Sequence, residues 1–308
     1  MSRAWLFPGQ GTQRRGMGAA VFDLYPGLVE RADRILGYSL RELCLEDPDG
    51  RLGSTEYCQP ALFVVNALLF LELRRRQPWP AFIAGHSLGE FSALFAAGSF
   101  DFDTGVRIVR ERARCMATAA RSGAMLAVIG LQLNQLQDLV AELGLAGLDV
   151  ANYNLPTQTV MAGPDLEIAA LDQALLARQL ARTVHLHVGG AFHSRYAAKA
   201  AAAFHAALSQ FELHDPKLPT VSSVTGRPYQ PGTVRTILEG QILGPVRWLD
   251  TMQFLHGQGV TEARQIGPGR VLDGLWERFE PAADAGAAGA GSDAAGTPLF
   301  ATAPGEHR

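Results

Sequence analysis

Short apolar runs alternate with longer stretches of helical periodicity over the first 120 residues. The runs at 4–7 and 82–84 predict strands, and apolar residues recur at helical spacing over 17–45, 60–76 and 103–120. Strands that alternate with helices are typical of a parallel α/β sheet. In such a fold the functional site lies at the carboxyl ends of the strands.

The pattern changes after Gly123, where strand-like and helix-like segments follow in the order β-α-β-β-α-β. This order is the ferredoxin-like arrangement, and it predicts a small inserted domain of roughly 65 residues. The six predicted segments are 124–130, 133–143, 148–154, 159–162, 166–180 and 182–188.

We therefore expect an α/β protein in which a large catalytic domain is interrupted by a small one. The large domain, α/β-hydrolase-like with a parallel sheet, comprises 1–122 and 190–278, and the ferredoxin-like domain comprises 123–189. An alanine-rich helix at 195–210 returns the chain to the large domain. Residues 279–308 are rich in Ala, Gly, Asp, Pro and Ser, so we expect a flexible tail or linker there.

Composition narrows the class of partner and the compartment. Hydrophobic residues make up 47% of the chain and charged residues 19%, with a net charge of −3, which argues against nucleic acid or an anionic membrane. Cys44, Cys58 and Cys115 lack metal-ligand spacing and fit a reducing compartment. Pro8 and Gly9 interrupt the N-terminal apolar run too early for a signal peptide, and no run reaches the ~18 residues of a membrane span. We expect a cytoplasmic protein without a metal site.

The segment Gly85-His86-Ser87-Leu88-Gly89-Glu90 contains a G-x-S-x-G motif between a predicted strand and a predicted helix at 91–97. In that context the serine lies on a sharp turn, its hydroxyl is exposed, and the next amide can face an oxyanion. The pentapeptide alone also occurs by chance. Ser87 is the candidate nucleophile.

A serine nucleophile needs a base, and three of the eight histidines cluster where the small domain ends. His185 and His187 alternate with apolar residues, which favours exposed strand positions for both. His193 lies in a loop that leads into a helix. The helix N-terminus disfavours the imidazolium form, so His193 suits a general base.

Two further segments have alternative interpretations. Gly9-Gln10-Gly11 lacks the Lys-[Ser/Thr] of a phosphate loop, and it is either a tight turn or, together with the amide of Leu88, an oxyanion hole. Arg112 is flanked at helical spacing by Ile108, Val109, Cys115 and Met116, so its charge needs a partner. That partner is either a ligand carboxylate or an internal salt bridge.

Taken in order, these residues resemble the malonyl-CoA:acyl carrier protein transacylase family, which includes polyketide-synthase acyltransferases. The resemblance covers residues 4–276, nearly all of the chain that we expect to be ordered. The shared landmarks are Phe7-Pro8-Gly9-Gln10-Gly11-Thr12-Gln13, Gln59-Pro60-Ala61, 85–90, Arg112, Asn154, Ala191-Phe192-His193-Ser194 and Gly267-Pro268-Gly269-Arg270-Val271-Leu272.

The resemblance implies a Ser–His dyad in which Ser87 is acylated and His193 is its base. It implies that the backbone carbonyl of Gln241 orients the histidine. The amides of Gln10 and Leu88 would form the oxyanion hole.

The resemblance also implies the substrates and the residues that select them. Arg112 would bind the malonyl carboxylate, and Phe192 would narrow the pocket against an α-methyl branch. Gln59, Met116 and Asn154 would line the pocket. Malonyl-CoA would be the donor, and the phosphopantetheine thiol of a holo acyl carrier protein the acceptor, with no metal or bound cofactor.

Two departures from the family pattern bear on the biological role. Gly190 stands where many polyketide relatives have histidine, and Ala113 stands where glycine is common. Glycine at the position of Gly190 also occurs in discrete acyltransferases that serve synthases lacking their own. Together with segment 101–103 and the linker-like tail, it favours a trans-acting polyketide enzyme over a housekeeping fatty-acid enzyme. Other hypotheses are an editing acyl hydrolase, whose relatives generally lack the arginine, and a non-catalytic carrier-protein docking module.

Overall fold

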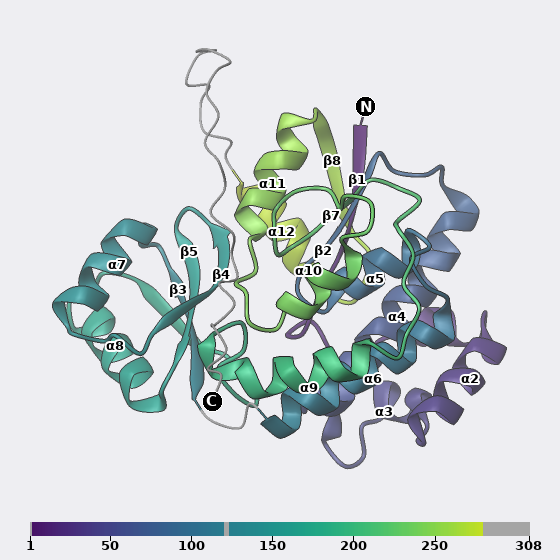
Figure 1. The fold of residues 1–308 in the computed structure, drawn as a ribbon, viewed down its shortest axis with the longest axis horizontal. Coiled ribbons are helices and arrows are strands. Elements are labelled where there is room, and N and C mark those ends of the chain that lie inside the picture. The colour runs from purple at the N-terminus through teal and green to yellow at the C-terminus, as the bar shows by residue number, and fades with distance from the viewer. Residues whose placement is uncertain (1, 120–122, 280–308) are drawn as a thin grey trace, which may run out of the picture.

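The computed structural model describes residues 2–119 and 123–279, which form a larger and a smaller lobe (Figure 1). The larger lobe contains a parallel sheet in the strand order β7-β2-β1-β8, as the alternation of strands and helices predicted. These strands are β1 (Ser2–Phe7), β2 (Phe82–Gly85), β7 (Thr220–Val221) and β8 (Val260–Gln265).

Helices cover both faces of the parallel sheet, which explains why its central strands are almost wholly apolar. Ala4 and Leu6 of β1 pack toward α11 (Trp248–Gly257) and α12 (Val271–Arg278). Trp5 and Phe7 project to the opposite face and join a cluster with α4 (Thr55–Arg76) and α5 (Gly89–Ala96). Because successive side chains of a strand point to opposite faces of the sheet, alternate residues of β1 belong to two separate hydrophobic cores.

The helical pattern predicted for 17–45 is divided into three short helices. These are α1 (Ala19–Phe22), α2 (Pro26–Leu36) and α3 (Leu40–Leu45). Pro26 is the first residue of α2, and Gly37 ends it in the left-handed conformation at φ 82°. The predicted helix 103–120 is α6 (Phe102–Ala119).

Helix α4 is long and apolar enough to span a membrane by length and composition alone. In the structure, however, 67% of that apolar window is buried inside the protein, against neighbours that include α5 and α6. A helix that is apolar all round and enclosed by other elements is a core helix of a folded domain.

The smaller lobe has the predicted element order, with an antiparallel sheet in the order β4-β5-β3-β6. Its two helices lie on the side of the sheet away from the larger lobe (Figure 1). The elements are β3 (Ala124–Ile129), α7 (Leu133–Glu142), β4 (Asp149–Leu155), β5 (Gln158–Gly163), α8 (Asp165–Ala177) and β6 (Arg182–His185).

One strand is shorter than predicted. The alternating pattern predicted a strand over 182–188, but β6 ends at His185. Leu186 and Val188 instead line the cavity between the lobes, so their apolar side chains are explained by that cavity and not by the sheet.

Backbone hydrogen bonds tie β4 to the larger lobe. The Tyr153 amide donates to the Val246 carbonyl at 2.9 Å, and the Val246 amide donates to the Ala151 carbonyl at 2.8 Å. The chain re-enters the larger lobe through the 3₁₀ turn η2 (Arg195–Ala197) and α9 (Ala198–Leu208), followed later by α10 (Val234–Gly240).

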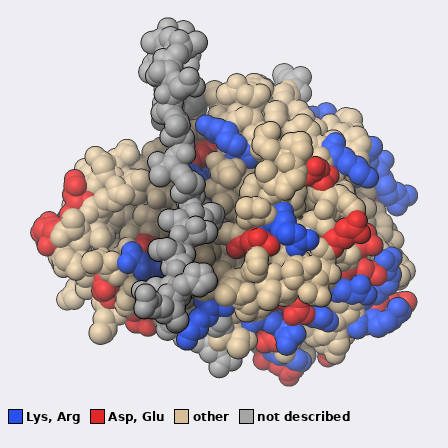
Figure 2. Space-filling model, in the orientation of Figure 1, with Lys and Arg blue, Asp and Glu red and all other residues tan. Residues whose placement is uncertain are grey.

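The predicted tail, 279–308, falls almost wholly outside the described residues, which end at Phe279. Phe279 itself is buried against Trp276 and His256. On the face drawn in Figure 2, Lys and Arg are interspersed with Asp and Glu and do not gather in one broad patch.

Candidate active site

Ser87 lies on the tight turn between β2 and α5, in the left-handed conformation at φ 52°. Two glycines make the turn possible because backbone approaches both of them closely. A Cβ on Gly89 would lie 1.9 Å from the Phe7 carbonyl oxygen, and one on Gly85 would lie 2.1 Å from the Gly89 carbonyl carbon. The second glycine of the G-x-S-x-G pattern therefore reflects the packing of β1 against this turn, and the first reflects the close folding of the turn on itself.

His193 is placed to activate Ser87. The Ser87 Oγ lies 2.8 Å from His193 Nε2, and His193 Nδ1 lies 3.0 Å from the carbonyl oxygens of both Gln241 and Gly244. Because carbonyls only accept, Nδ1 carries the proton and Nε2 is free to accept from the serine hydroxyl. His193 is buried and also has a positive φ of 57°. Both members of the dyad thus occupy strained backbone, which the surrounding packing must hold in place.

Burial and, after it, the neighbouring cation of Arg112 together lower the pKa of His193 to about 3. The two carbonyls at Nδ1 favour the protonated ring but do not offset these effects. The imidazole is therefore neutral at physiological pH and competent as a base.

This low pKa predicts an unusual pH profile for acylation of Ser87. A base with the ordinary histidine pKa would lose half its activity near pH ~6.5. Because His193 becomes protonated only as the pH falls through its depressed pKa, we expect kcat/KM for acylation to stay level from about pH 8 to about pH 5. Stopped-flow acylation across this range checks the prediction, and an acid limb centred near pH ~6.5 would contradict it.

Arg112 reaches the nucleophile from α6. Its guanidinium donates to Gln59 Oε1 at 2.6 Å, to Gln241 Oε1 at 3.2 Å and to Ser87 Oγ at 3.2 Å. The side chain is fully buried and lies over the ring of Phe91. Burial lowers the pKa of Arg112 to about 9, so it remains cationic at neutral pH.

Of the two partners that the sequence allowed for Arg112, the structure shows no internal salt bridge within the described residues. Its hydrogen-bond acceptors are two amide oxygens and a hydroxyl, which are neutral. A buried cation with only neutral partners is costly, and an incoming carboxylate would compensate it. The arrangement therefore favours an anionic ligand beside Ser87.

A cavity of about 70 Å³ contains the dyad and opens between the lobes. Gln59 is held in its wall by the hydrogen bond from Arg112 and by a contact of its amide with Met116 Sδ at 3.4 Å. The cavity is lined by Gln10, Gln59, His86, Ser87, Leu88, Arg112, Met116, Met125, Asn152, Leu186, Val188, Phe192 and His193.

Asn154, which we expect to bind substrate, is not among the described residues that line this cavity. Its side-chain oxygen lies 3.0 Å from Nε2 of His86, which itself lines the cavity. Asn152, two residues earlier on β4, lines the cavity in its place and also lies 3.4 Å from His86 Nε2. Burial lowers the pKa of His86, so this ring is neutral and serves to pack the turn against Trp248.

Several other residues of the site were not identified from the sequence. Met125, Leu186 and Val188 are apolar residues whose periodicity indicates only strands. Glu90, the last residue of the quoted hexapeptide, is fully buried and bonds to Gln241. Its sequence signal is that it is the one charged residue in the otherwise uncharged helix α5.

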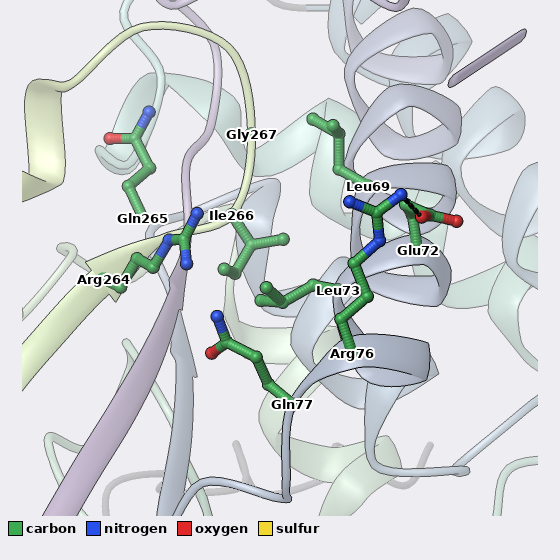
Figure 3. Close-up of a pocket in the computed structure, with 9 residues that line it drawn as sticks. All are labelled: Leu69, Glu72, Leu73, Arg76, Gln77, Arg264, Gln265, Ile266 and Gly267. Atoms are coloured by element: carbon green, nitrogen blue, oxygen red, sulfur yellow. Dashed lines mark ion pairs between the residues drawn. The ribbon is translucent and has the colours of Figure 1, made fainter. Parts of the chain in front are cut away.

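A larger cavity of about 400 Å³ lies between the end of α4 and β8 (Figure 3). Arg76 in its wall pairs with Glu72, and the Gln265 side chain bonds to the backbone of Pro268 and Leu272. The described residues that line it include no serine, cysteine or histidine. It therefore offers no nucleophile and base, and the smaller cavity is the candidate active site.

The chain matches an acyl transferase domain family over residues 4–255. The polyketide biosynthesis malonyl CoA-acyl carrier protein transacylase PksC of Bacillus subtilis is 42% identical over 285 residues, which cover 91% of this chain and 98% of PksC. The polyketide biosynthesis protein ThaF of Burkholderia thailandensis is 46% identical over 98% of this chain, which spans only 26% of ThaF.

Solved structures show the same architecture. The crystal structure of a malonyl CoA-acyl carrier protein transacylase from Burkholderia pseudomallei superposes with a TM-score of 0.87 at 43% identity. The match covers 92% of this chain and all of the crystallised chain. The α/β fold with its parallel sheet is thus shared between the two proteins.

Proposed function

Because the chain belongs to the acyl transferase domain family, we propose that it transfers a malonyl group from malonyl-CoA to the phosphopantetheine thiol of an acyl carrier protein. The observation that carries the proposal is the buried Arg112 cation, which lies 3.2 Å from the hydroxyl of a serine already paired with a histidine base. The serine supplies acyl transfer, and the cation supplies the preference for an acyl group that ends in a carboxylate.

In the first half-reaction, His193 Nε2 takes the proton of Ser87 as Oγ attacks the thioester carbonyl of malonyl-CoA. The amides of Gln10 and Leu88 would stabilise the oxyanion of the tetrahedral intermediate. Collapse of the intermediate breaks the C–S bond, and the CoA thiolate leaves with the proton from His193. The product is a malonyl-serine ester.

In the second half-reaction, the thiol of the carrier's phosphopantetheine gives its proton to His193 and attacks the ester. The C–O bond breaks, the proton returns to Ser87, and the malonyl group leaves on the carrier. Arg112 would hold the malonyl carboxylate through both steps and so orient the carbonyl toward Oγ. The chemistry as proposed needs no metal or bound cofactor.

Phe192 supports selection of malonyl over α-branched substrates. Phe192 is buried and lines the cavity. Its side chain would take up space that an α-methyl group requires. Exclusion of one methyl group is worth about 1–3 kcal/mol, so we expect methylmalonyl-CoA to react roughly 10- to 200-fold more slowly.

We further propose that the small lobe is a ferredoxin-like domain formed by 123–189, inserted into an α/β-hydrolase-like domain of 1–122 and 190–278. The alternation of strands and helices and the strand order β4-β5-β3-β6 support this division. The cavity between the two lobes would then be the entrance for the substrate arm.

The polyketide names of PksC and ThaF support a role in polyketide biosynthesis, in which the protein acts on a free-standing carrier or on the carrier domain of a synthase. A housekeeping fatty-acid role is the alternative, because the same transfer serves both pathways. A cytoplasmic location fits the free cysteines Cys44, Cys58 and Cys115.

Intact-mass measurement of the acylated protein tests the proposed function. We expect malonyl-CoA to give a stable adduct of malonyl mass that is lost on addition of a holo acyl carrier protein, which gains the same mass. Acetyl-CoA should give little adduct, because it offers no carboxylate to Arg112, and methylmalonyl-CoA should react slowly.

Two outcomes would contradict the proposal in different ways. Steady release of free malonate with no lasting adduct would indicate an editing acyl hydrolase. A serine inert toward every acyl-CoA would indicate a docking module without catalysis. In both cases, an observation that the protein binds the carrier protein would not be sufficient evidence for a transferase.

A further inference from the structure

We propose that Glu90 is a positioning residue for malonyl transfer, which acts by fixing the orientation of the Gln241 side chain beside Arg112. The inference rests on the proposed function. Glu90 lies on α5, three residues after the nucleophile, and is fully buried. No lysine or arginine pairs with it in the described part of the chain, so neutral donors must hold its carboxylate.

Four hydrogen bonds enclose the Glu90 carboxylate, two on each oxygen. Oε1 accepts from the Ser223 amide at 3.1 Å and from the Tyr229 hydroxyl, and Oε2 accepts from Ser223 Oγ at 2.8 Å and from Gln241 Nε2. All four groups donate to the carboxylate, and each oxygen faces one N–H group that cannot accept in return, the Ser223 amide at Oε1 and Gln241 Nε2 at Oε2. This suits a carboxylate and disfavours a side chain that carries its own N–H. Burial, and then the charge of Glu90, raises the pKa of the Tyr229 hydroxyl and keeps it a donor.

Gln241 connects this carboxylate to Arg112, to the backbone of Ser87 and to His193. Its Nε2 donates to Glu90 Oε2 and to the Ser87 carbonyl at 3.1 Å, while its Oε1 accepts from Arg112 Nε at 3.2 Å. Its backbone carbonyl accepts from His193 Nδ1 at 3.0 Å. An amide has one donor end and one acceptor end, so the acceptors at Nε2 determine that oxygen faces the guanidinium.

The carboxylate also affects the charge of Arg112 without contacting it. Glu90 raises the pKa of Arg112 against the larger lowering by burial, yet Gln241 separates the two side chains. A direct ion pair would occupy the guanidinium and compete with a malonyl carboxylate. The intervening amide lets Glu90 stabilise the cation while leaving Arg112 available to the substrate.

The matching test is Glu90→Gln, which keeps the shape of the side chain but places its N–H₂ group against either the Ser223 amide or Gln241 Nε2, neither of which can accept. With the acceptor at Gln241 lost or weakened, the Gln241 amide can turn its N–H₂ toward Arg112. We expect kcat/KM for malonyl loading to fall about 10- to 100-fold. Acetyl loading should fall much less, because His193 keeps the Gly244 carbonyl at 3.0 Å.

The ratio of malonyl to acetyl loading is the decisive readout, because a general loss of folded protein lowers both rates equally. Tyr229→Phe is the matched control, since it removes a hydrogen bond from the other oxygen of the same carboxylate and leaves Gln241 in place. Leu139→Ala, in the small-lobe core, controls for lost stability alone. Both controls should retain the wild-type ratio.

A second variant keeps the proposal testable if Glu90→Gln does not fold. Gln241→Met retains the backbone carbonyl for His193 but removes the amide, so it should lower the malonyl-to-acetyl ratio to a similar degree. An unchanged ratio in a folded Glu90→Gln or in Gln241→Met would overturn the positioning role. Failure of the wild type to form any malonyl adduct would instead overturn the proposed function on which this inference rests.

Discussion

Replacing Ser87 with alanine is expected to abolish the malonyl adduct and to reduce transfer to a carrier protein by at least about 10³-fold. Ser87 Oγ is the nucleophile that His193 contacts at 2.8 Å, and alanine leaves the base without a hydroxyl to deprotonate. The oxyanion amides and the Arg112 cation would remain, so binding should survive. Intact mass after incubation with malonyl-CoA, together with a carrier-loading assay, measures both effects.

The His193→Ala variant and the double variant serve as controls for this result. Because the two side chains act as a unit, we expect each single variant and the double variant to lose similar activity. Thermal unfolding should show that Ser87→Ala remains folded. Persistent labelling of Ser87→Ala by malonyl-CoA would show that another residue is acylated and would contradict the assignment of Ser87 as the nucleophile.

The Ser87 turn was predictable because its determinants are local in the sequence. Neighbouring backbone lies so close to Gly85 and Gly89 that neither position can hold a side chain. Both glycines fall within one five-residue motif, which can be recognised in the sequence. The parallel sheet was predictable in part, since β1 and β2 are short apolar runs. Strand β8 was not predicted, because Val260–Gln265 is rich in polar residues at an edge of the sheet.

Residues that act through long-range contacts could not be found in this way. Gln241 follows Ser87 by 154 positions, and the resemblance implied a role only for its backbone carbonyl. The orientation of its side chain depends on Glu90, which a sequence shows merely as a charge in an apolar helix. Only the fold reveals that Gln241 contacts the base through its backbone carbonyl and contacts both the Ser87 turn and the Arg112 cation through its side-chain amide.

Asn152, which the sequence did not single out, lies in the cavity wall on the same strand as Asn154. The two residues are two apart on β4 and so would share one face of a regular strand. The pairing of β4 with β5 shifts register between Val150 and Asn152 and again between Tyr153 and Leu155. Both asparagines nevertheless reach Nε2 of His86, at 3.4 Å from Asn152 and 3.0 Å from Asn154, and Asn152 also lines the cavity.

Replacing Arg112 with alanine is expected to reverse the substrate preference. Malonyl loading should fall about 10²- to 10³-fold, because the carboxylate would enter a buried site without its cation. Acetyl loading should be largely retained, since the Ser87–His193 pair remains. Removal of the positive charge should also raise the pKa of His193 above about 3, so the acid limb of acetyl loading moves to higher pH.

Arg114→Ala is the matched control for Arg112→Ala, because Arg114 lies on the same helix but is exposed and pairs with Glu111. It should leave both loading rates and the pH profile unchanged. Arg112→Ala could instead leave malonyl transfer intact while simple acyl thioesters are hydrolysed rapidly. That result would show that the cation does not select malonyl substrates, and it would favour the editing acyl hydrolase. A large loss confined to malonyl loading would instead support the role of the Arg112 cation in binding the substrate carboxylate.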